Sequence, residues 1–230
     1  MGIQERRERE KKEHRQRILD AALDIIVADG FAALSMRRLA DRIEYSAASI
    51  YLYFENREQI AQELAEIAFG KLLNVLSDAT LIPGAVEAFH ALGLAYVRYG
   101  LENPQLYRLI FMSGTDYMTA ALGSQKTPNV GMRAYGALLD VAKRLQTAGI
   151  LSDSPTVQVA ELIWMTLHGI VSLHITCVGL KLASPEKLAR LATKTLAAQT
   201  ESDKGIVILK KSPASPKASN LIKRHAPASR

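Results

Sequence analysis

The chain has 230 residues, 48% of them hydrophobic and 23% charged, a composition that excludes a wholly disordered protein and is sufficient for a large core. Its formal net charge of +6 suggests nucleic-acid binding. However, residues 1–60 contain eleven basic and eleven acidic side chains, whereas residues 201–230 contain seven basic and two acidic ones. The surplus positive charge therefore lies at the end of the chain, and a nucleic-acid-binding interpretation must depend on a motif.

Residues 1–13 are expected to form a charged, solvated helical extension. Acidic residues precede basic ones by four positions, as in Glu8 and Lys12, and pairs with this spacing stabilise an exposed helix. A segment this densely charged is unlike a secretory signal peptide. An alternative is an arm that contacts DNA, with three candidates: Arg6, Arg7 and Arg9.

An amphipathic helix is predicted to follow this extension. Hydrophobic residues recur at helical spacing from Ile18 through Ile26. Gly30 comes next, and a glycine at this point commonly ends a helix in the left-handed conformation. We expect this helix to support the next motif rather than to contact DNA.

Residues 35–57, SMRRLADRIEYSAASIYLYFENR, predict two short helices joined by a tight turn and followed by the start of a third. Ser35, Ser46 and Asn56 each stand where a side-chain oxygen can accept the free N–H groups of a first helical turn. Two capped helices this close in sequence must cross steeply, which is the geometry of a helix-turn-helix. The hydrophobic face of the first helix consists of Met36, Leu39, Ala40 and Ile43.

The run SAASIYLYFENRE, residues 46–58, resembles the recognition-helix signature of tetracycline-repressor (TetR) type regulators. The resemblance covers residues 14–75, which we expect to form the DNA-binding domain. It implies an all-α fold of about nine helices in a dimeric, ligand-responsive DNA-binding protein. Glu44 departs from the pattern, because the turn usually contains glycine, and a left-handed residue other than glycine costs about 1 kcal/mol.

The resemblance also assigns DNA contacts to this motif. Positions that match phosphate contacts are Ser49, Tyr51, Tyr53 and Arg57, and positions that match base-edge contacts are Arg37, Ala47, Ala48, Ser49 and Leu52. The predicted DNA-binding set is completed by Ser35, Arg38 and Ser46.

Base readout at this motif is expected to be sparse. Ala47, Ala48 and Leu52 carry no hydrogen-bonding group, so they can only touch thymine methyl groups or leave room for water. Arg37 can bind guanine bidentately, and DNA shape is expected to provide the remaining specificity. The alternatives are that Arg37 is a solvated surface charge and that Tyr51 packs in the core.

Residues 76–200 are expected to form a larger helical domain for ligand binding and dimerisation, and residues 201–230 a disordered basic tail. The predicted helices run from Glu58 to about Ser77, from Pro83 to Gly100, from Asn103-Pro104 through Phe111, from Val130 to Thr147, from Ser154-Pro155 to about Leu180, and from Ser184-Pro185 through Leu196. Residues 113–129 are expected to form a loop with a short helical piece.

Residues 162–180 form an uncharged run of 19 residues, long enough to be considered as a membrane span. The run contains polar residues such as Thr166, His168 and His174, so we interpret it as a helix buried between the core and a second subunit. The chain's single cysteine, Cys177, lies in this run and suits a reducing compartment. We therefore expect a cytoplasmic protein with no membrane partner.

A second resemblance is to the "WHG" class of carboxy-terminal domains of the same family. It rests on Trp164, His168 and Gly169, together with the segments 102–104 and 107–108. A functional interpretation places seven residues around an apolar effector pocket: Phe89, Tyr96, Phe111, Met112, Trp164, Met165 and His168. The alternative is that these residues fill the core, with His168 as a satisfied buried histidine.

The leading functional hypothesis is a transcriptional repressor. A homodimer would bind a near-palindromic double-stranded DNA operator, with recognition helices about 34 Å apart, and a small apolar or amphipathic effector would release it. One alternative is a constitutive DNA-binding dimer without a ligand pocket. An all-helical enzyme is less favoured, because the chain contains no His-Glu-x-x-His, Gly-x-Ser-x-Gly or phosphate-loop motif. No cofactor or metal is expected.

Overall fold

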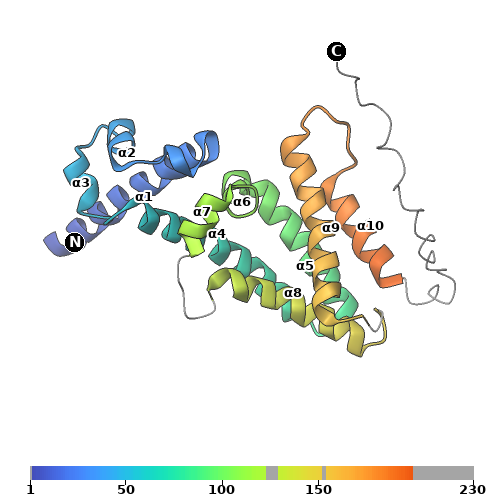
Figure 1. Cartoon of the computed structure of the whole chain (residues 1–230). Coiled ribbons are helices and arrows are strands. Elements are labelled where there is room, and N and C mark those ends of the chain that lie inside the picture. Colours follow the sequence, from blue (N-terminus) through green and yellow to red (C-terminus); the bar gives the residue numbers. More distant parts are fainter. Residues whose placement is uncertain (1, 123–128, 152–153, 199–230) are drawn as a thin grey trace, which may run out of the picture. The chain divides into compact units, whose positions relative to one another are not determined.

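The computed structural model describes residues 2–122, 129–151 and 154–198, and among these residues it contains ten α-helices and one short 3₁₀ helix but no strand (Figure 1). The prediction of an all-α fold with about nine helices is confirmed. The predicted tail, residues 201–230, lies outside the described residues. The helices are α1 (Ile3–Asp29), η1 (Phe31–Ala33), α2 (Met36–Arg42), α3 (Ala47–Tyr51), α4 (Arg57–Thr80), α5 (Ala85–Glu102), α6 (Pro104–Phe111), α7 (Thr115–Leu122), α8 (Val130–Thr147), α9 (Thr156–Thr176) and α10 (Pro185–Ala198).

The charged extension and the first amphipathic helix form one continuous helix, α1. Its first half is exposed, and there Arg6 donates to Glu10 one turn later at 2.8 Å. Its second half is buried through hydrophobic residues between Ile18 and Ile26. Gly30 ends the helix with φ +82°, a conformation that a residue with a Cβ rarely adopts, as its sequence position predicts.

Arg15 joins α1 to α4 and to the segment between α3 and α4. Its guanidinium forms an ion pair with Glu63 of α4, donates to the Tyr53 carbonyl oxygen at 2.7 Å, and lies 4.2 Å from the centroid of the Phe54 ring. No such contact was predicted for Arg15 from the sequence.

The three predicted helix caps are present in the helix-turn-helix. The side chain of Ser35 accepts from the Arg38 N–H at 3.1 Å, that of Ser46 from the Ser49 N–H at 3.1 Å, and that of Asn56 from the Gln59 N–H at 2.8 Å. Glu44 has φ +58° and is the left-handed residue of the turn. The Tyr45 N–H donates to the Ala40 carbonyl at 2.9 Å, beside a longer bond from the Ile43 N–H at 3.3 Å, and this contact at the end of α2 offsets part of the strain.

The helix α4 is the structural link between the two predicted domains. It begins at the helix-turn-helix and packs against α5, α6, α7 and α8. Its end is held by Arg144 of α8, which donates to the carbonyl oxygens of Thr80, Ile82 and Pro83. A rigid helix with both ends held can transmit a displacement along its length.

Two details of the α5–α6 region differ from the sequence prediction. Gly100 does not end α5, which continues to Glu102; a Cβ at Gly100 would lie 2.4 Å from Cγ1 of Val171, so the glycine permits close packing of α5 on α9. Asn103 precedes α6 as predicted, but its side chain makes no cap bond and donates instead to the Tyr99 carbonyl at 3.0 Å.

The helix α9 has a buried inner face and an apolar outer face. Among the described residues, α9 is the one helix whose length and apolar composition would be sufficient to cross a membrane. Its inner face packs into the core through six residues: Val159, Ala160, Ile163, Leu167, Val171 and Ile175. Leu162, Met165 and Leu173 are exposed on the other side, and Leu191 is exposed on the neighbouring α10. The helix ends at Thr176, four residues before the predicted end.

Candidate DNA-binding surface and effector cavity

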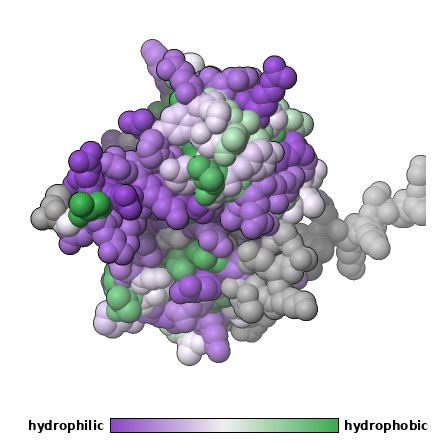
Figure 2. Space-filling view, turned by 90° about the vertical axis from the view of Figure 1, so that its left-hand side faces the viewer, coloured by the Kyte–Doolittle hydropathy of each residue, from purple (hydrophilic) through white to green (hydrophobic). Residues whose placement is uncertain are grey.

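The short helix α3 buries one side and exposes the other. Ile50 and the following Phe54 are buried in the core of the amino-terminal region, whereas Tyr51 and Leu52 are 56% and 78% exposed. The prediction for Tyr51 left core packing open, and the structure places this side chain at the surface. Figure 2 shows that the face of the molecule carrying this region is largely hydrophilic, with small, separate hydrophobic spots.

The predicted DNA-binding residues lie at the starts of α2 and α4 and along α3. Those that the structure exposes are Ser35, Arg37, Arg38, Ser46, Ala48, Tyr51 and Leu52. Those that it leaves half-buried are Ala47, Ser49, Tyr53 and Arg57. Helices α2 and α3 are in contact, so these residues belong to one region of the surface.

The three arginines of this region have different surroundings. Arg38 forms an ion pair with Asp29 of α1. Arg57 donates to the Leu34 carbonyl at 3.2 Å and lies 4.8 Å from the centroid of the Phe31 ring, so it joins the start of α4 to the segment before α2. Arg37 is exposed and has no ion pair within the described part of the chain. Arg37 is therefore the arginine of the three whose guanidinium is available for a base edge.

A cavity of about 500 Å³ lies in the larger helical region, with walls from α4 through α9. Its lining is mostly aromatic and aliphatic. The residues are Phe69, Leu72, Leu76, Tyr96, Ile110, Phe111, Met118, Asn129, Gly131, Met132, Ala134, Tyr135, Leu138, Val157, Glu161 and Trp164. A concave apolar site with few polar groups is the usual form of a small-molecule site. We refer to it as the effector cavity.

The structure brings only some of the predicted pocket residues to this cavity. Tyr96, Phe111 and Trp164 line it. His168 lies behind this wall, with its ring centroid 5.8 Å from that of Phe111.

The other three predicted pocket residues lie elsewhere. Phe89 is fully buried and stacks on His90, with ring centroids 6.3 Å apart. Met112 lines a different hollow beside α1, and Met165 is 63% exposed on the outer face of α9. Sequence spacing alone did not distinguish the inner and outer faces of these helices.

A chain of side-chain hydrogen bonds runs from the cavity wall into the core. The indole N–H of Trp164 donates to the Tyr96 hydroxyl at 3.0 Å; this hydroxyl lies 3.0 Å from that of Tyr107, which lies 2.6 Å from Nδ1 of His168. If the Tyr96 hydroxyl donates to that of Tyr107, and the Tyr107 hydroxyl donates to His168, then Nδ1 of His168 is the final acceptor. A ring nitrogen that accepts a hydrogen bond carries no proton, so the imidazole is neutral. Burial raises the pKa values of Tyr96 and Tyr107, so both phenols are protonated at neutral pH.

Burial lowers the pKa of His168, and this shift predicts a pH dependence of stability. His168 binds a proton more tightly in the unfolded chain than in the folded chain. The free energy of unfolding is therefore highest above pH 6.5 and decreases below it. For this one group the decrease is at most about 1.4 kcal/mol per pH unit. His168→Asn retains an acceptor for Tyr107 but does not titrate, so the free energy of unfolding of this variant should depend less on pH. Urea unfolding at pH 8, 6.5 and 5 measures this dependence. The same dependence in the variant and the wild type contradicts a lowered pKa of His168.

Several lining residues were not predicted to belong to the pocket. Phe69 and Tyr135 lie within predicted helices but had no assigned role, and Glu161 was not among the predicted pocket residues. The spacing of Val157, Glu161 and Trp164 at i, i+4 and i+7 places all three on one face of α9. This pattern could have assigned Glu161 to the same site as Trp164.

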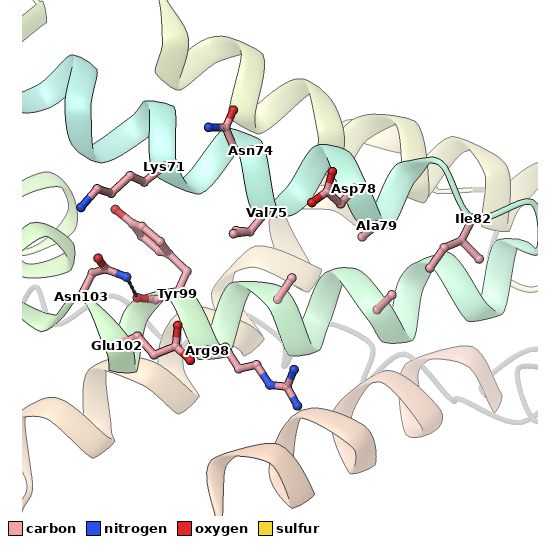
Figure 3. Close-up of a pocket in the computed structure, with 12 residues that line it drawn as sticks. Lys71, Asn74, Val75, Asp78, Ala79, Ile82, Arg98, Tyr99, Glu102 and Asn103 are labelled. Carbon is pink, nitrogen blue, oxygen red and sulfur yellow. Dashed lines mark hydrogen bonds between the residues drawn. The ribbon is translucent and has the colours of Figure 1, made fainter.

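A larger groove, of about 760 Å³, lies between α4 and α5 (Figure 3). Lys71, Asp78, Arg98 and Glu102 line it, together with Asn103, whose side chain donates to the Tyr99 carbonyl. Because its charged side chains are of both signs and reach solvent, water competes with any ligand here. The effector cavity is the better candidate for a small-molecule site.

Among the described residues, no group of three His, Cys, Asp or Glu side chains is placed to hold a metal ion. Tyr96 and Trp164 of the lining are engaged in the hydrogen-bond chain, whereas Asn129 and Glu161 lie outside it. Among the described lining residues, none is a nucleophile with an adjacent base.

Comparison with known proteins identifies two matching domain families. Residues 18–64 match the family described as bacterial regulatory proteins, tetR family, and residues 89–198 match the tetracyclin repressor-like, C-terminal domain. The first match contains α2 and α3, and the second contains most helices of the effector cavity.

Individual proteins show the same similarity. The uncharacterized HTH-type transcriptional regulator YobS of Bacillus subtilis is 24% identical over 156 residues, which are 68% of this chain and 76% of that protein. The HTH-type transcriptional repressor KstR of Mycobacterium tuberculosis is 29% identical over 75 residues, 33% of this chain and 34% of that protein. The crystal structure of the TetR family regulator PfmR of Thermus thermophilus has a TM-score of 0.62 at 19% identity, and the match covers 79% of this chain and 94% of PfmR.

Proposed function

The chain belongs to the TetR family of transcriptional regulators and has its helix-turn-helix DNA-binding domain, and from this premise we propose that it is a ligand-responsive repressor in the cytoplasm. In this proposal a homodimer binds a near-palindromic operator through α2 and α3. A small apolar or amphipathic effector in the cavity releases the dimer from DNA. The relative named as a repressor, KstR, supports the direction of regulation.

The observation that supports ligand response most strongly is that the cavity shares its walls with the helices that hold the DNA-binding region. Phe69, Leu72 and Leu76 of α4 line the cavity, and the same helix begins at Arg57 beside the segment before α2. A ligand that displaces these residues therefore displaces the support of the helix-turn-helix.

A second connection passes through α6. Ile110 and Phe111 at its end line the cavity, and the helix packs against α1, where Gln105 donates to Asp24 at 3.2 Å. Because both α4 and α6 touch the cavity and the DNA-binding region, a ligand that prefers one arrangement of them changes the affinity for DNA. A constitutive dimer is the alternative, and the presence of a sizeable apolar cavity favours the ligand-responsive protein.

The dimer in this proposal uses the outer faces of α9 and α10. Leu162, Met165, Leu173 and Leu191 leave apolar surface exposed on two neighbouring helices. Two such helices and their symmetry mates can form a four-helix interface, in which each exposed residue meets the same surface of the second copy. The apolar outer face of α9 is then covered by protein rather than by lipid.

Selection of bound sequences from random DNA duplexes tests the DNA-binding proposal. The wild-type protein is expected to select two inverted half-sites, and Arg37→Ala is expected to lose the preference at one position of each half-site, a discrimination of about 1–3 kcal/mol. Arg42→Ala is the matched control, because Arg42 is exposed on the same helix, α2, but is not among the predicted DNA-binding residues. An unchanged sequence preference in Arg37→Ala contradicts the assignment of base readout to this residue.

A further inference from the structure

The described lining of the effector cavity has a single sign of charge. Glu161 of α9 contributes a carboxylate, and the lining includes no Lys, Arg or His side chain among the residues that the structure describes. Glu161 is half-buried and forms no ion pair in those residues. An anionic ligand in this cavity would place its charge near a carboxylate without a compensating cation among the described lining residues, which is unfavourable in a poorly hydrated site.

Aromatic rings surround the same part of the cavity. The ring centroids of Tyr135 and Trp164 are 6.2 Å apart with planes inclined at 62°, and Phe111 lies 5.8 Å from Trp164. The faces of such rings attract cations, and indole does so most strongly. The pKa of Tyr135 is raised, first by burial and second by the nearby carboxylate of Glu161, so the negative potential of Glu161 reaches this ring.

The wall offers little to an anionic head group. The indole N–H of Trp164 is donated to Tyr96 at 3.0 Å, and the Tyr96 hydroxyl is also engaged with Tyr107. At the edge of the cavity, the Asn129 side-chain oxygen accepts the Met132 N–H at 2.9 Å, so this residue can offer an anion only its neutral amide N–H groups. A carboxylate therefore finds the indole donor already occupied, whereas a cation needs only the ring faces and Glu161.

The position of Glu161 also orients the ligand. It lies one helical turn from Val157, which is exposed, as is Met132 on the facing helix α8. The part of the lining that α4 contributes includes the buried, apolar side chains of Leu72 and Leu76. A charged head group near Glu161 thus stays close to the opening while a hydrocarbon body enters the apolar part.

From this arrangement we infer that the cavity binds a lipophilic cation, an amphiphile with an amine or quaternary ammonium head group between Glu161 and the rings of Trp164 and Tyr135. The inference rests on the proposed function for its regulatory role, because it names the ligand class of the effector cavity. Binding to the cavity itself can be measured without DNA.

Three probes with the same ten-carbon chain test the inference on the full-length protein: decyltrimethylammonium, decan-1-ol and decanoate, each below the concentration at which it aggregates. Trp164 is the single tryptophan of the chain and lines the cavity, so its fluorescence reports binding there. The expected order of affinity is the cation first, the alcohol second and the carboxylate last. Glu161→Gln is expected to weaken binding of the cation by about tenfold and to leave the alcohol unchanged.

The controls separate this inference from the proposed function. Tyr135→Phe retains the ring face, so its affinity for the cation should stay close to that of the wild type. Decanoate binding as tightly as the cation, or cation binding that Glu161→Gln does not weaken, overturns the ligand class and leaves a ligand-responsive repressor possible. Selective cation binding without any loss of DNA affinity overturns the effector role alone. If none of the three probes binds, by Trp164 fluorescence or by equilibrium dialysis, the ligand class is overturned, and the proposed repressor function is then tested by its own DNA-selection experiment.

Discussion

Ala48→Glu is expected to lower the affinity for operator DNA by about 100-fold or more while the protein remains folded. Ala48 is exposed on α3, at a position that faces base edges in the proposed complex. A carboxylate there would meet the negative phosphates that flank the groove, and like-charge contacts at an interface cost several kcal/mol. A competition binding assay with the selected operator, at fixed salt concentration, measures the loss.

The fold should tolerate this substitution. Ala48 lies in the first turn of α3, where an acidic side chain interacts favourably with the free N–H groups of the helix. Ala32→Glu is the matched control, since Ala32 is also exposed but lines the hollow beside α6 and α7. If Ala48→Glu retains wild-type affinity, or if Ala32→Glu loses as much, α3 is not the DNA-reading helix.

Met165→Glu is expected to convert the dimer into a monomer and, as a consequence, to reduce operator affinity by about 100-fold or more. Met165 is 63% exposed in the isolated chain, on the outer face of α9. In the proposed four-helix interface each copy would bury the new carboxylate without a partner, which is strongly unfavourable. A monomer contacts one half-site and loses the gain in affinity that comes from linking two contacts.

Sedimentation velocity at the concentrations of the DNA-binding assay measures this change. Leu81→Glu is the matched control, because Leu81 is also an exposed hydrophobic residue, at 79% against 63% for Met165, but it belongs to the end of α4 and not to α9 or α10. The control should remain a dimer with wild-type affinity. A Met165→Glu protein that is still dimeric shows that the interface lies elsewhere, and the roles proposed for α9 and α10 are then wrong.

Local signals explain why the helix-turn-helix could be predicted in detail. Ser35, Ser46 and Asn56 are caps whose chemistry acts over three residues, so the sequence pattern contains everything needed to place them. The departure at Glu44 was also local, and the structure shows that a left-handed residue other than glycine is accommodated there. The same holds for Gly30, whose position after a hydrophobic stripe was sufficient.

Long-range packing explains what could not be predicted. Gly100 resembled a helix end because its role, the close approach of α9, depends on Val171 far along the chain. The role of Arg15 likewise depends on Glu63, 48 residues away.

The effector cavity shows the same limit. Its wall comes from six helices, and the sequence alone did not show which side of α9 turns inward, so Met165 was grouped with Trp164. Periodicity identifies a hydrophobic face, but α9 is apolar on both sides. Only the packing of its neighbours decides which face lines the cavity.

In the proposed complex, one dimer binds two half-sites through its paired α3 helices. Hydroxyl-radical footprinting of the selected operator, combined with the mass of the complex in solution, is the decisive measurement. We expect two chains per duplex and two protected segments whose centres are about 10 base pairs apart, or a multiple of this helical repeat. A single protected segment with one chain bound would contradict it.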